Sequence, residues 1–326
     1  MTTQTTPPPA ISPTLDELLD AELAFSTVYQ RYYASHLSMS LVALEALGAP
    51  PSVLEETFAA HERRATPRED PAAVDAVRAE IARDSIEATV RARTPGLVDA
   101  PGTQLFHAVI RLAYALDANH EGQVAASLVD WDRLNRVLPA PEPTRGSRRV
   151  DEVLALLGAQ TDVAESRHSI RELDAIVRLD GFRRSVAEVA IDEHTLDDVA
   201  TLTLHAHVAA DDFFTLHMVT GAHAVRVVSE HLDDAVSARL AARTVQVMAA
   251  AYLGVGAPTL AGPEELDAIR RSALPTWDEI AAAAVADRDA HVVKLTYVSR
   301  AEHRRTGDPL YQYVAARVVG LTGERP

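Results

Sequence analysis

The stretch Ala290-His291-Val292-Val293-Lys294-Leu295 places a histidine and a lysine three residues apart in an otherwise apolar segment. In an α-helix, residues i and i+3 project from neighbouring points of one face, so both side chains can reach a common point. A helix is expected here because Thr276 and Glu279 have the spacing of a capping box, and Gly307 followed by Pro309 marks the far end. The pair is therefore predicted to lie in the middle of a helix over residues 277–305.

The rest of the chain has the same helical signature. Apolar residues recur at three- and four-residue spacing, and alternating β-branched runs bounded by turns are rare. We therefore predict an all-α protein with a single multi-helix domain. Thr14 and Glu17 are expected to form a capping box at the start of a helix running towards Tyr29, and a second helix from Ser35 to Leu47 should stop at Gly48-Ala49-Pro50-Pro51. Further helices are predicted near residues 73–93, 103–117, 121–137, 150–158, 170–190, 196–210, 211–230, 233–253 and 263–272.

The amino terminus and one internal segment depart from this pattern. Residues 1–13 are polar and proline-rich and lack the basic and apolar regions of a signal peptide, so a disordered tail is predicted before a helical domain over residues 14–326. Residues 138–149 include Pro139, Pro141 and Pro143, whose alternation excludes a helix and predicts a hinge or loop. No run of eighteen apolar residues occurs, so we expect no membrane span and a cytoplasmic location.

Composition limits the chemistry that the protein can perform. The chain has 326 residues, of which 47% are hydrophobic, and this is enough for a large core. It has no cysteine, which excludes disulfides, cysteine nucleophiles, iron–sulfur clusters and thiolate zinc sites. A formal charge of −16 argues against a nucleic-acid partner, because binding phosphates requires a basic surface. The oligomeric state is left open.

Four of the thirteen histidines lie in apolar surroundings, namely His36, His107, His217 and His291. A single histidine in such a place is more often a hydrogen-bonded core residue than a metal ligand. Four together, with an apolar lysine segment and no cysteine, favour a metal centre between helices. His223 is a fifth candidate; it follows His217 by six residues and faces another side of a continuous helix.

Several segments together resemble the questin oxidase family. They are residues 34–39 followed by 47–49, residues 104–116 (QLFHAVIRLAYAL), residues 215–226 (TLHMVTGAHAVR), residues 291–295 (HVVKL) and residues 305–309 (RTGDP). Their order and spacing extend the resemblance over nearly the whole chain. The resemblance implies an oxygen-consuming enzyme that opens a quinone ring of an anthraquinone or related aromatic polyketide, by a formal Baeyer–Villiger or dioxygenase reaction.

The resemblance also implies a mononuclear non-haem iron, held by four histidines and a lysine that is carboxylated on its ε-amine. On this chain these ligands correspond to His36, His107, His217, His291 and Lys294, with His223 as the alternate to His217. Dioxygen is the implied co-substrate, and NADPH is a candidate external reductant. The small aromatic substrate is the expected partner.

Elementary chemistry supports such a use of Lys294. Burial disfavours the charged ammonium and lowers the pKa of a lysine, and a neutral amine can add carbon dioxide to form an anionic carbamate ligand. Four imidazoles and one carbamate suit Fe(II) and leave roughly one of six octahedral positions open, although imidazoles suit zinc, copper and nickel as well. The alternative is that Lys294 lies along the core with its ammonium in water.

Other side chains near the predicted ligands are candidates for contacts with the substrate or with the ligands themselves. Arginines suit phenolate or carboxylate groups, but each also forms ordinary ion pairs, and aromatic residues at helical spacing are usually core. The candidates are Arg31, Arg111, Arg226 and Tyr33, with Phe106, Tyr114 and Phe214 as further aromatic side chains.

Two other classes of protein remain open at this point. Leu204-His205-Ala206-His207 followed by Asp211-Asp212 resembles the ligands of helical metal-dependent phosphohydrolases, although spacing i, i+2 directs the two histidines to opposite helix faces. The other alternative is a non-catalytic helical protein that binds a polyketide. Replacing Lys294 by methionine separates them, because only the oxygenase should lose metal and activity.

Overall fold

The computed structural model describes residues 11–29, 33–140, 146–158 and 173–322, and in these residues the chain is almost entirely helical. The predicted all-α fold is confirmed. The helices are α1 (Pro13–Glu22), α2 (Leu37–Ala46), α3 (Pro51–Glu62), α4 (Pro71–Asp84), α5 (Ile86–Arg93), α6 (His107–Asp117), α7 (Glu121–Leu134), α8 (Val150–Gly158), α10 (Leu173–Ile176), α11 (Asp180–Val186), α12 (Thr195–Ala210), α13 (Phe213–Ser229), α14 (Asp234–Gly254), α15 (Pro263–Arg270), α16 (Trp277–Asp287), α17 (Ala290–Thr306) and α18 (Pro309–Val318), with one 3-10 turn at Thr94–Gly96.

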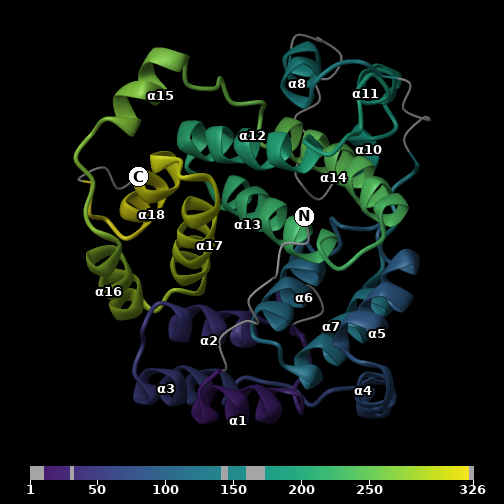
Figure 1. Cartoon of the computed structure of the whole chain (residues 1–326), viewed down its shortest axis with the longest axis vertical. Helices are drawn as coiled ribbons and strands as arrows, with labels where there is room; N and C mark the ends of the chain where they lie inside the picture. The colour runs from purple at the N-terminus through teal and green to yellow at the C-terminus, as the bar shows by residue number, and fades with distance from the viewer. Residues whose placement is uncertain (1–10, 30–32, 141–145, 159–172, 323–326) are drawn as a thin grey trace, which may run out of the picture.

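Helix α13 lies at the centre of the molecule and contacts α6, α12, α14 and α17 (Figure 1). It starts with a capping box of Asp212 and Thr215, and its residues are buried over most of its length. A helix that is apolar on all sides has to be surrounded by other helices. The other helices pack around it on one continuous hydrophobic core, which makes the described chain a single domain.

A two-stranded antiparallel hairpin, β1 (Val28–Tyr29) and β2 (Tyr33–Ala34), joins α1 to α2. This part of the sequence prediction is wrong, because the helix expected to run towards Tyr29 ends at Glu22. Its start was also misjudged: Ser12, whose hydroxyl accepts a hydrogen bond from the backbone N–H of Leu15, is the N-cap, and no capping box forms at Thr14. Pro13 then occupies the first turn, where a missing N–H costs nothing.

The predicted helix over residues 277–305 is divided into α16 and α17 at Arg288, whose φ of 62° is left-handed. The capping box of Thr276 with Glu279 and the left-handed Gly307 at the far end are both as expected. Because of the break, His291 lies in the first turn of α17 and not in the middle of a long helix. Asp289 caps the new helix by accepting hydrogen bonds from two backbone N–H groups.

Other boundaries were also wrong. The predicted helix 73–93 is divided at Ser85, which has a φ of 107° and caps α5, and the helix 103–117 begins only at His107. The helix 170–190 is replaced by the short α10 and α11, with residues 170–172 outside the described residues. Helices α3 and α18 were not predicted; each begins with a proline, which resembles a helix stop in the sequence but is favourable in a first turn.

Two further expectations fall wholly or partly on residues that the structure leaves undescribed. Most of the predicted tail over residues 1–13 lies outside the described residues, as do residues 141–145 of the predicted hinge or loop. The flanking residues of that loop are described, and they form no helix before Val150. Among the described helices, none is long and apolar enough to cross a bilayer.

Candidate metal centre

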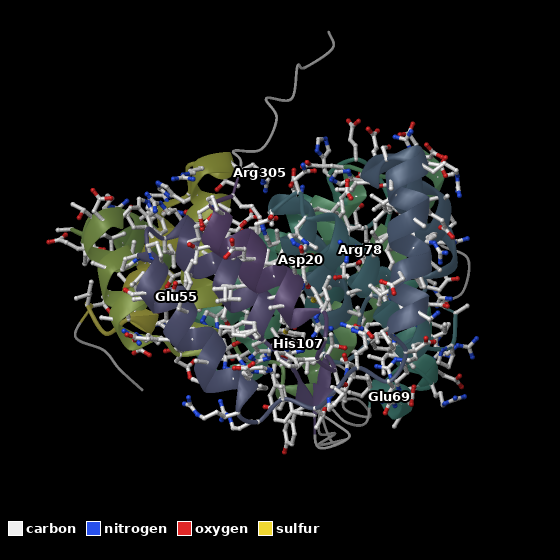
Figure 2. The ribbon with its side chains drawn as sticks, turned by 90° about the horizontal axis from the view of Figure 1, so that it is seen from below. Asp20, Glu55, Glu69, Arg78, His107 and Arg305 are labelled. Carbon is white, nitrogen blue, oxygen red and sulfur yellow. The ribbon has the colours of Figure 1, made fainter. Side chains whose placement is uncertain are left out.

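Four helices that pack in a closed cycle carry the four histidines of the sequence prediction. Helix α2 packs on α6, α6 on α13, α13 on α17, and α17 on α2. His36 immediately precedes α2, His107 is the first residue of α6, His217 lies on α13, and His291 is the second residue of α17. Helices that are far apart in sequence therefore bring the four side chains together. His107 is buried, whereas Asp20 and Glu55, which are labelled with it in Figure 2, are exposed.

The four imidazoles form a closed ring, which we call the four-histidine cluster. Ring centroids lie 4.7 Å apart for His36 and His107, 4.9 Å for His107 and His217, 5.2 Å for His217 and His291, and 4.7 Å for His291 and His36. Ligand nitrogens of His36, His217 and His291 all lie within 4.8 Å of one another. The Nε2 atoms of His36 and His107 are 2.7 Å apart.

Backbone carbonyls determine which nitrogen of two histidines faces the cluster. The Nδ1 of His107 lies 2.6 Å from the carbonyl oxygen of Gln104, and the Nδ1 of His217 lies 2.7 Å from that of Phe213. A carbonyl only accepts, so each Nδ1 must carry the proton and each Nε2 presents a lone pair. This is the arrangement that orients a metal-ligating histidine.

An unusual backbone conformation places His107. Gln104, Leu105 and Phe106 are all left-handed, with φ values of 52°, 55° and 67°, a conformation that side-chain-bearing residues rarely adopt. The ring of Phe106 packs against Gly221 on α13, where a Cβ atom would lie 2.7 Å from its Cγ. The contact between α6 and α13 thus holds the strained turn that presents His107.

Lys294 lies one helical turn beyond His291 and is fully buried. Its Nζ has no hydrogen-bond partner among the described residues. Burial, and to a smaller extent the charge of Arg111, lowers the pKa of Lys294 to about 7. The alternative that its ammonium reaches water is therefore wrong. Lys294 is also the only lysine in the chain, all other basic side chains apart from histidine being arginine.

Three of the clustered histidines are uncharged at neutral pH. Burial is the main cause that lowers the pKa of His36, of His107 and of His217, and the nearby amine of Lys294 is the second cause for each. The pKa of His217 falls to about 3. Neutral imidazoles are the form that binds metals.

The donor set fits a metal ion. The Nε2 atoms of His217 and His291 and the Nζ of Lys294 are buried without a hydrogen-bond partner among the described residues, which is costly for a polar atom. At bond lengths near 2.1 Å, two nitrogens on one ion lie about 3 Å apart when adjacent and about 4.2 Å apart when opposite. The 2.7 Å between the Nε2 atoms of His36 and His107 is near the shorter of these values, and the ligand nitrogens of His36, His217 and His291 lie within 4.8 Å of one another. Such nitrogen-rich ligation suits iron, zinc, copper or nickel.

Other predicted residues lie outside the cluster. The Nδ1 of His223 lies 2.5 Å from Oε1 of Glu302, and Arg226 forms ion pairs with Glu302 and Asp197. His217, and not His223, therefore takes part in the ring of imidazoles. Arg226 is occupied by carboxylates on the far side of α13.

The remaining candidates differ in what they contact. Arg111 is fully buried and donates hydrogen bonds to the carbonyl oxygens of Ser35 and Thr27, so it holds the segment that carries His36. Tyr33 is 53% exposed, and its ring contacts that of Tyr29. Phe106 and Tyr114 are core residues. Arg31 lies outside the described residues.

Sequence reasoning missed three residues that support the cluster. Gln104 and Phe213 supply the carbonyl oxygens described above, and the ring of Phe213 contacts both His217 and His291. Asp289 lies 3.5 Å from the Nδ1 of His291. The i, i+4 spacing of Phe213 and His217 was visible in the sequence, and so was an acidic residue two positions before His291. The left-handed turn at Gln104 has no local sequence signal.

The phosphohydrolase alternative does not assemble a site in the described residues. The Nδ1 of His207 lies 2.9 Å from Oγ1 of Thr215, and its Nε2 is 3.5 Å from Asp211. His205 lies on the other side of α12, where burial, and after it the charge of Arg270, lowers its pKa. The residue group that could hold a metal in the described chain contains none of these side chains.

A family model described as questin oxidase-like matches residues 93–299 of the chain. The chain belongs to this family. The match includes three of the four clustered histidines together with Lys294, while His36 precedes it. A comparison with curated proteins gave no match. Family membership supports an oxygenase-type role, and hence an oxidoreductase, in polyketide or anthraquinone metabolism.

Proposed function

We propose that this protein is an iron-dependent oxygenase that uses O₂ to open a ring of an anthraquinone or related aromatic polyketide. The observation that carries the proposal is the convergence of four imidazoles and one buried lysine on four packed helices. A bound Fe(II) would supply the activation of dioxygen. The proposed ligands are His36, His107, His217, His291 and Lys294.

The protein prepares these side chains before any metal binds. Gln104 and Phe213 hold the protons of His107 and His217 on Nδ1, which leaves both Nε2 lone pairs facing inward. A pKa of about 7 gives Lys294 a substantial neutral fraction at neutral pH. In the proposed carboxylation, the neutral Nζ forms a bond to the carbon of CO₂ and releases one proton to solvent, and the carbamate oxygen is then available as a ligand.

The proposed chemistry has two forms that differ in electron balance. A Baeyer–Villiger reaction inserts one oxygen atom and reduces the other to water, so it consumes two electrons from a reductant such as NADPH. A dioxygenase reaction transfers both atoms and needs no reductant. The ratio of NADPH to O₂ consumed, measured with an anthraquinone substrate, distinguishes one form from the other.

Metal analysis of protein purified anaerobically, without added metal or chelator, tests the proposal. We expect about one iron per chain in the wild type and a large loss in Lys294→Met and in His217→Gln, each of which removes a ligand. His223→Gln is the matched control and should keep its iron. Bound zinc that is indifferent to Lys294 would favour a hydrolase, and an empty site would favour a binding protein.

Carboxylation has its own readout, because the chain has a single lysine. Wild-type protein equilibrated with ¹³C-bicarbonate and diamagnetic Zn²⁺, which the same ligands suit, should give one lysine carbamate resonance by NMR. Lys294→Met should give none. A wild-type spectrum without that resonance, in protein that holds zinc, would contradict the carboxylated ligand while leaving the imidazoles in place.

A further inference from the structure

A cavity of about 570 Å³ lies beside the four-histidine cluster, and His36 forms part of its wall. Small-molecule sites usually have volumes of about 300–1,000 Å³. The cavity is bounded by α2, α3, the hairpin and the turn before α17; in Figure 1, α2 and α3 lie side by side below α17. Two other cavities, one between α2 and α16 and one near Asp130, contain none of the four histidines.

The wall around His36 combines apolar surface with a few polar groups. Ser40 lies one turn along α2 from His36 and lines the same cavity. On the opposite side, His61 of α3 lies 3.3 Å from the hydroxyl of Ser35, and burial lowers its pKa, so its imidazole is neutral. Tyr29 provides an aromatic surface at the hairpin. Such a wall suits a flat aromatic molecule with oxygen substituents.

Among the described residues that line the cavity, one cation has no ion pair. Arg288 forms an ion pair with Glu56 at 2.5 Å, and the carboxylate of Asp289 accepts the backbone N–H groups at the start of α17. Arg64 also lines the cavity, and its guanidinium has no ion pair or hydrogen bond with any described residue. An arginine in this state is suited to bind a carboxylate or phenolate oxygen.

We propose that this cavity binds the aromatic substrate, with an anionic oxygen of the substrate on Arg64 and its ring system extending past Ser40 to His36. The inference rests on the proposed function and adds to it the substrate class, a polycyclic aromatic with a carboxylate or ionised phenol at one end. Arg64 would then determine specificity, because it recognises a part of the substrate remote from the cluster.

Binding to metal-free protein tests this without relying on turnover. The probes are anthraquinone-2-carboxylate, 2-hydroxyanthraquinone and the neutral 2-(hydroxymethyl)anthraquinone, measured by calorimetry above the pKa of the phenol. We expect the wild type to bind the two anions more tightly than the neutral compound. Arg64→Gln should weaken the binding of the two anions about tenfold and leave the affinity for the neutral compound unchanged. If the substitution weakens the binding of anthraquinone-2-carboxylate alone, Arg64 selects aromatic acids and not phenols.

Matched variants separate the cavity from the rest of the surface. Arg63→Gln removes a neighbouring arginine that does not line the cavity, and it should behave as wild type. Ser40→Phe fills the cavity and should abolish binding of all three compounds, whereas Ser40→Ala should retain it. Equal affinities in wild type and Arg64→Gln, or undiminished binding to a folded Ser40→Phe, would overturn the inference.

The iron content of the same variants keeps the two proposals apart. If iron is present but Arg64→Gln and Ser40→Phe bind as wild type, the cavity assignment fails and the oxygenase proposal stands. If the protein binds no iron but Arg64 still distinguishes anionic from neutral ligands, the cavity assignment stands and the oxygenase proposal fails.

Discussion

Lys294 is chemically distinct from every other basic group that could occupy its position. A guanidinium stays protonated in proteins, so an arginine there would remain a buried cation that cannot add CO₂. The ammonium of a lysine can lose its proton, and full burial favours that loss. In a chain whose other long basic side chains are all arginine, the one lysine lies fully buried near the four-histidine cluster.

Because Lys294 is buried, we predict that the free energy of unfolding of the metal-free protein depends on pH. Its pKa is lowered from 10.5 to about 7, so between these values the unfolded chain holds a proton that the folded chain lacks. Stability is therefore unaffected above pH 10.5, falls as the pH decreases towards 7, and changes no further below it. Lys294→Met should raise the free energy of unfolding at pH 7.5 by a few kcal/mol, as measured by urea denaturation.

The same variant at higher pH is the control. The difference in the free energy of unfolding between wild type and Lys294→Met should shrink steadily as the pH rises towards 10. A difference that stays constant with pH would mean that packing, and not the proton, causes it. Since the same substitution is expected to reduce iron binding, gain of stability and loss of metal should occur together.

At the scale of elements, the contact between α6 and α13 sets the position of His107. Three consecutive left-handed residues are held by the packing of Phe106 against Gly221, so the strain is balanced by a tertiary contact. Gly→Ala inside a helix usually stabilises by up to about 1 kcal/mol. At Gly221 we expect the opposite, because the new methyl group would collide with the aromatic ring.

Gly221→Ala should lower the free energy of unfolding by about 1–3 kcal/mol, the usual cost of overpacking, and should weaken metal binding by displacing His107. Calorimetric unfolding and metal titration measure the two effects. A double-mutant cycle with Phe106→Ala isolates the contact: in that background Gly221→Ala should be neutral or stabilising. An equal loss with and without Phe106 would show that the helix itself, and not this contact, rejects the methyl group.

At the scale of the whole molecule, the protein buries several neutral histidines. Burial is the main cause that lowers the pKa of His36, His107 and His217 in the cluster, and it lowers that of His207 between α12 and α13 to about 3. On unfolding, each regains a pKa near 6.5 and binds a proton at mildly acidic pH. The contribution of these histidines to the free energy of unfolding is therefore present in full above pH 6.5, and it is lost as the pH falls below that value.

Between pH 7.5 and 5.5 we expect the metal-free protein to lose about 1 kcal/mol for each of these four histidines, as measured by urea denaturation at both values. The raised pKa values of the buried Glu22 and Asp117 offset part of this loss, since they act in the opposite direction. His207→Gln should reduce the loss of stability between these pH values by the share of one histidine, about 1 kcal/mol. His194 is exposed, so His194→Gln should leave the loss unchanged. A stability that does not change with pH would contradict the buried neutral state.

Much of the fold could be read from local patterns, and the errors have physical causes. The capping box of Thr276 and the left-handed Gly307 were recognised because caps depend on neighbouring residues alone. The breaks at Ser85 and Arg288 were missed, because both residues adopt positive φ values without being glycine. The first-turn prolines of α3 and α18 resemble helix stops in the sequence, although a proline is well tolerated there.

The helical class, the lack of thiolate ligands and a short set of polar residues in apolar surroundings could be read from the amino-acid sequence, because these features follow from composition and from periodicity within a few residues. Tertiary packing was needed to show that His217 and not His223 completes the ring and that Arg226 pairs with Glu302. It was also needed to show that Arg64, which has no ion pair with any described residue, lines a cavity beside His36. Such facts depend on how α2, α6, α13 and α17 pack, and packing joins residues that no local pattern relates.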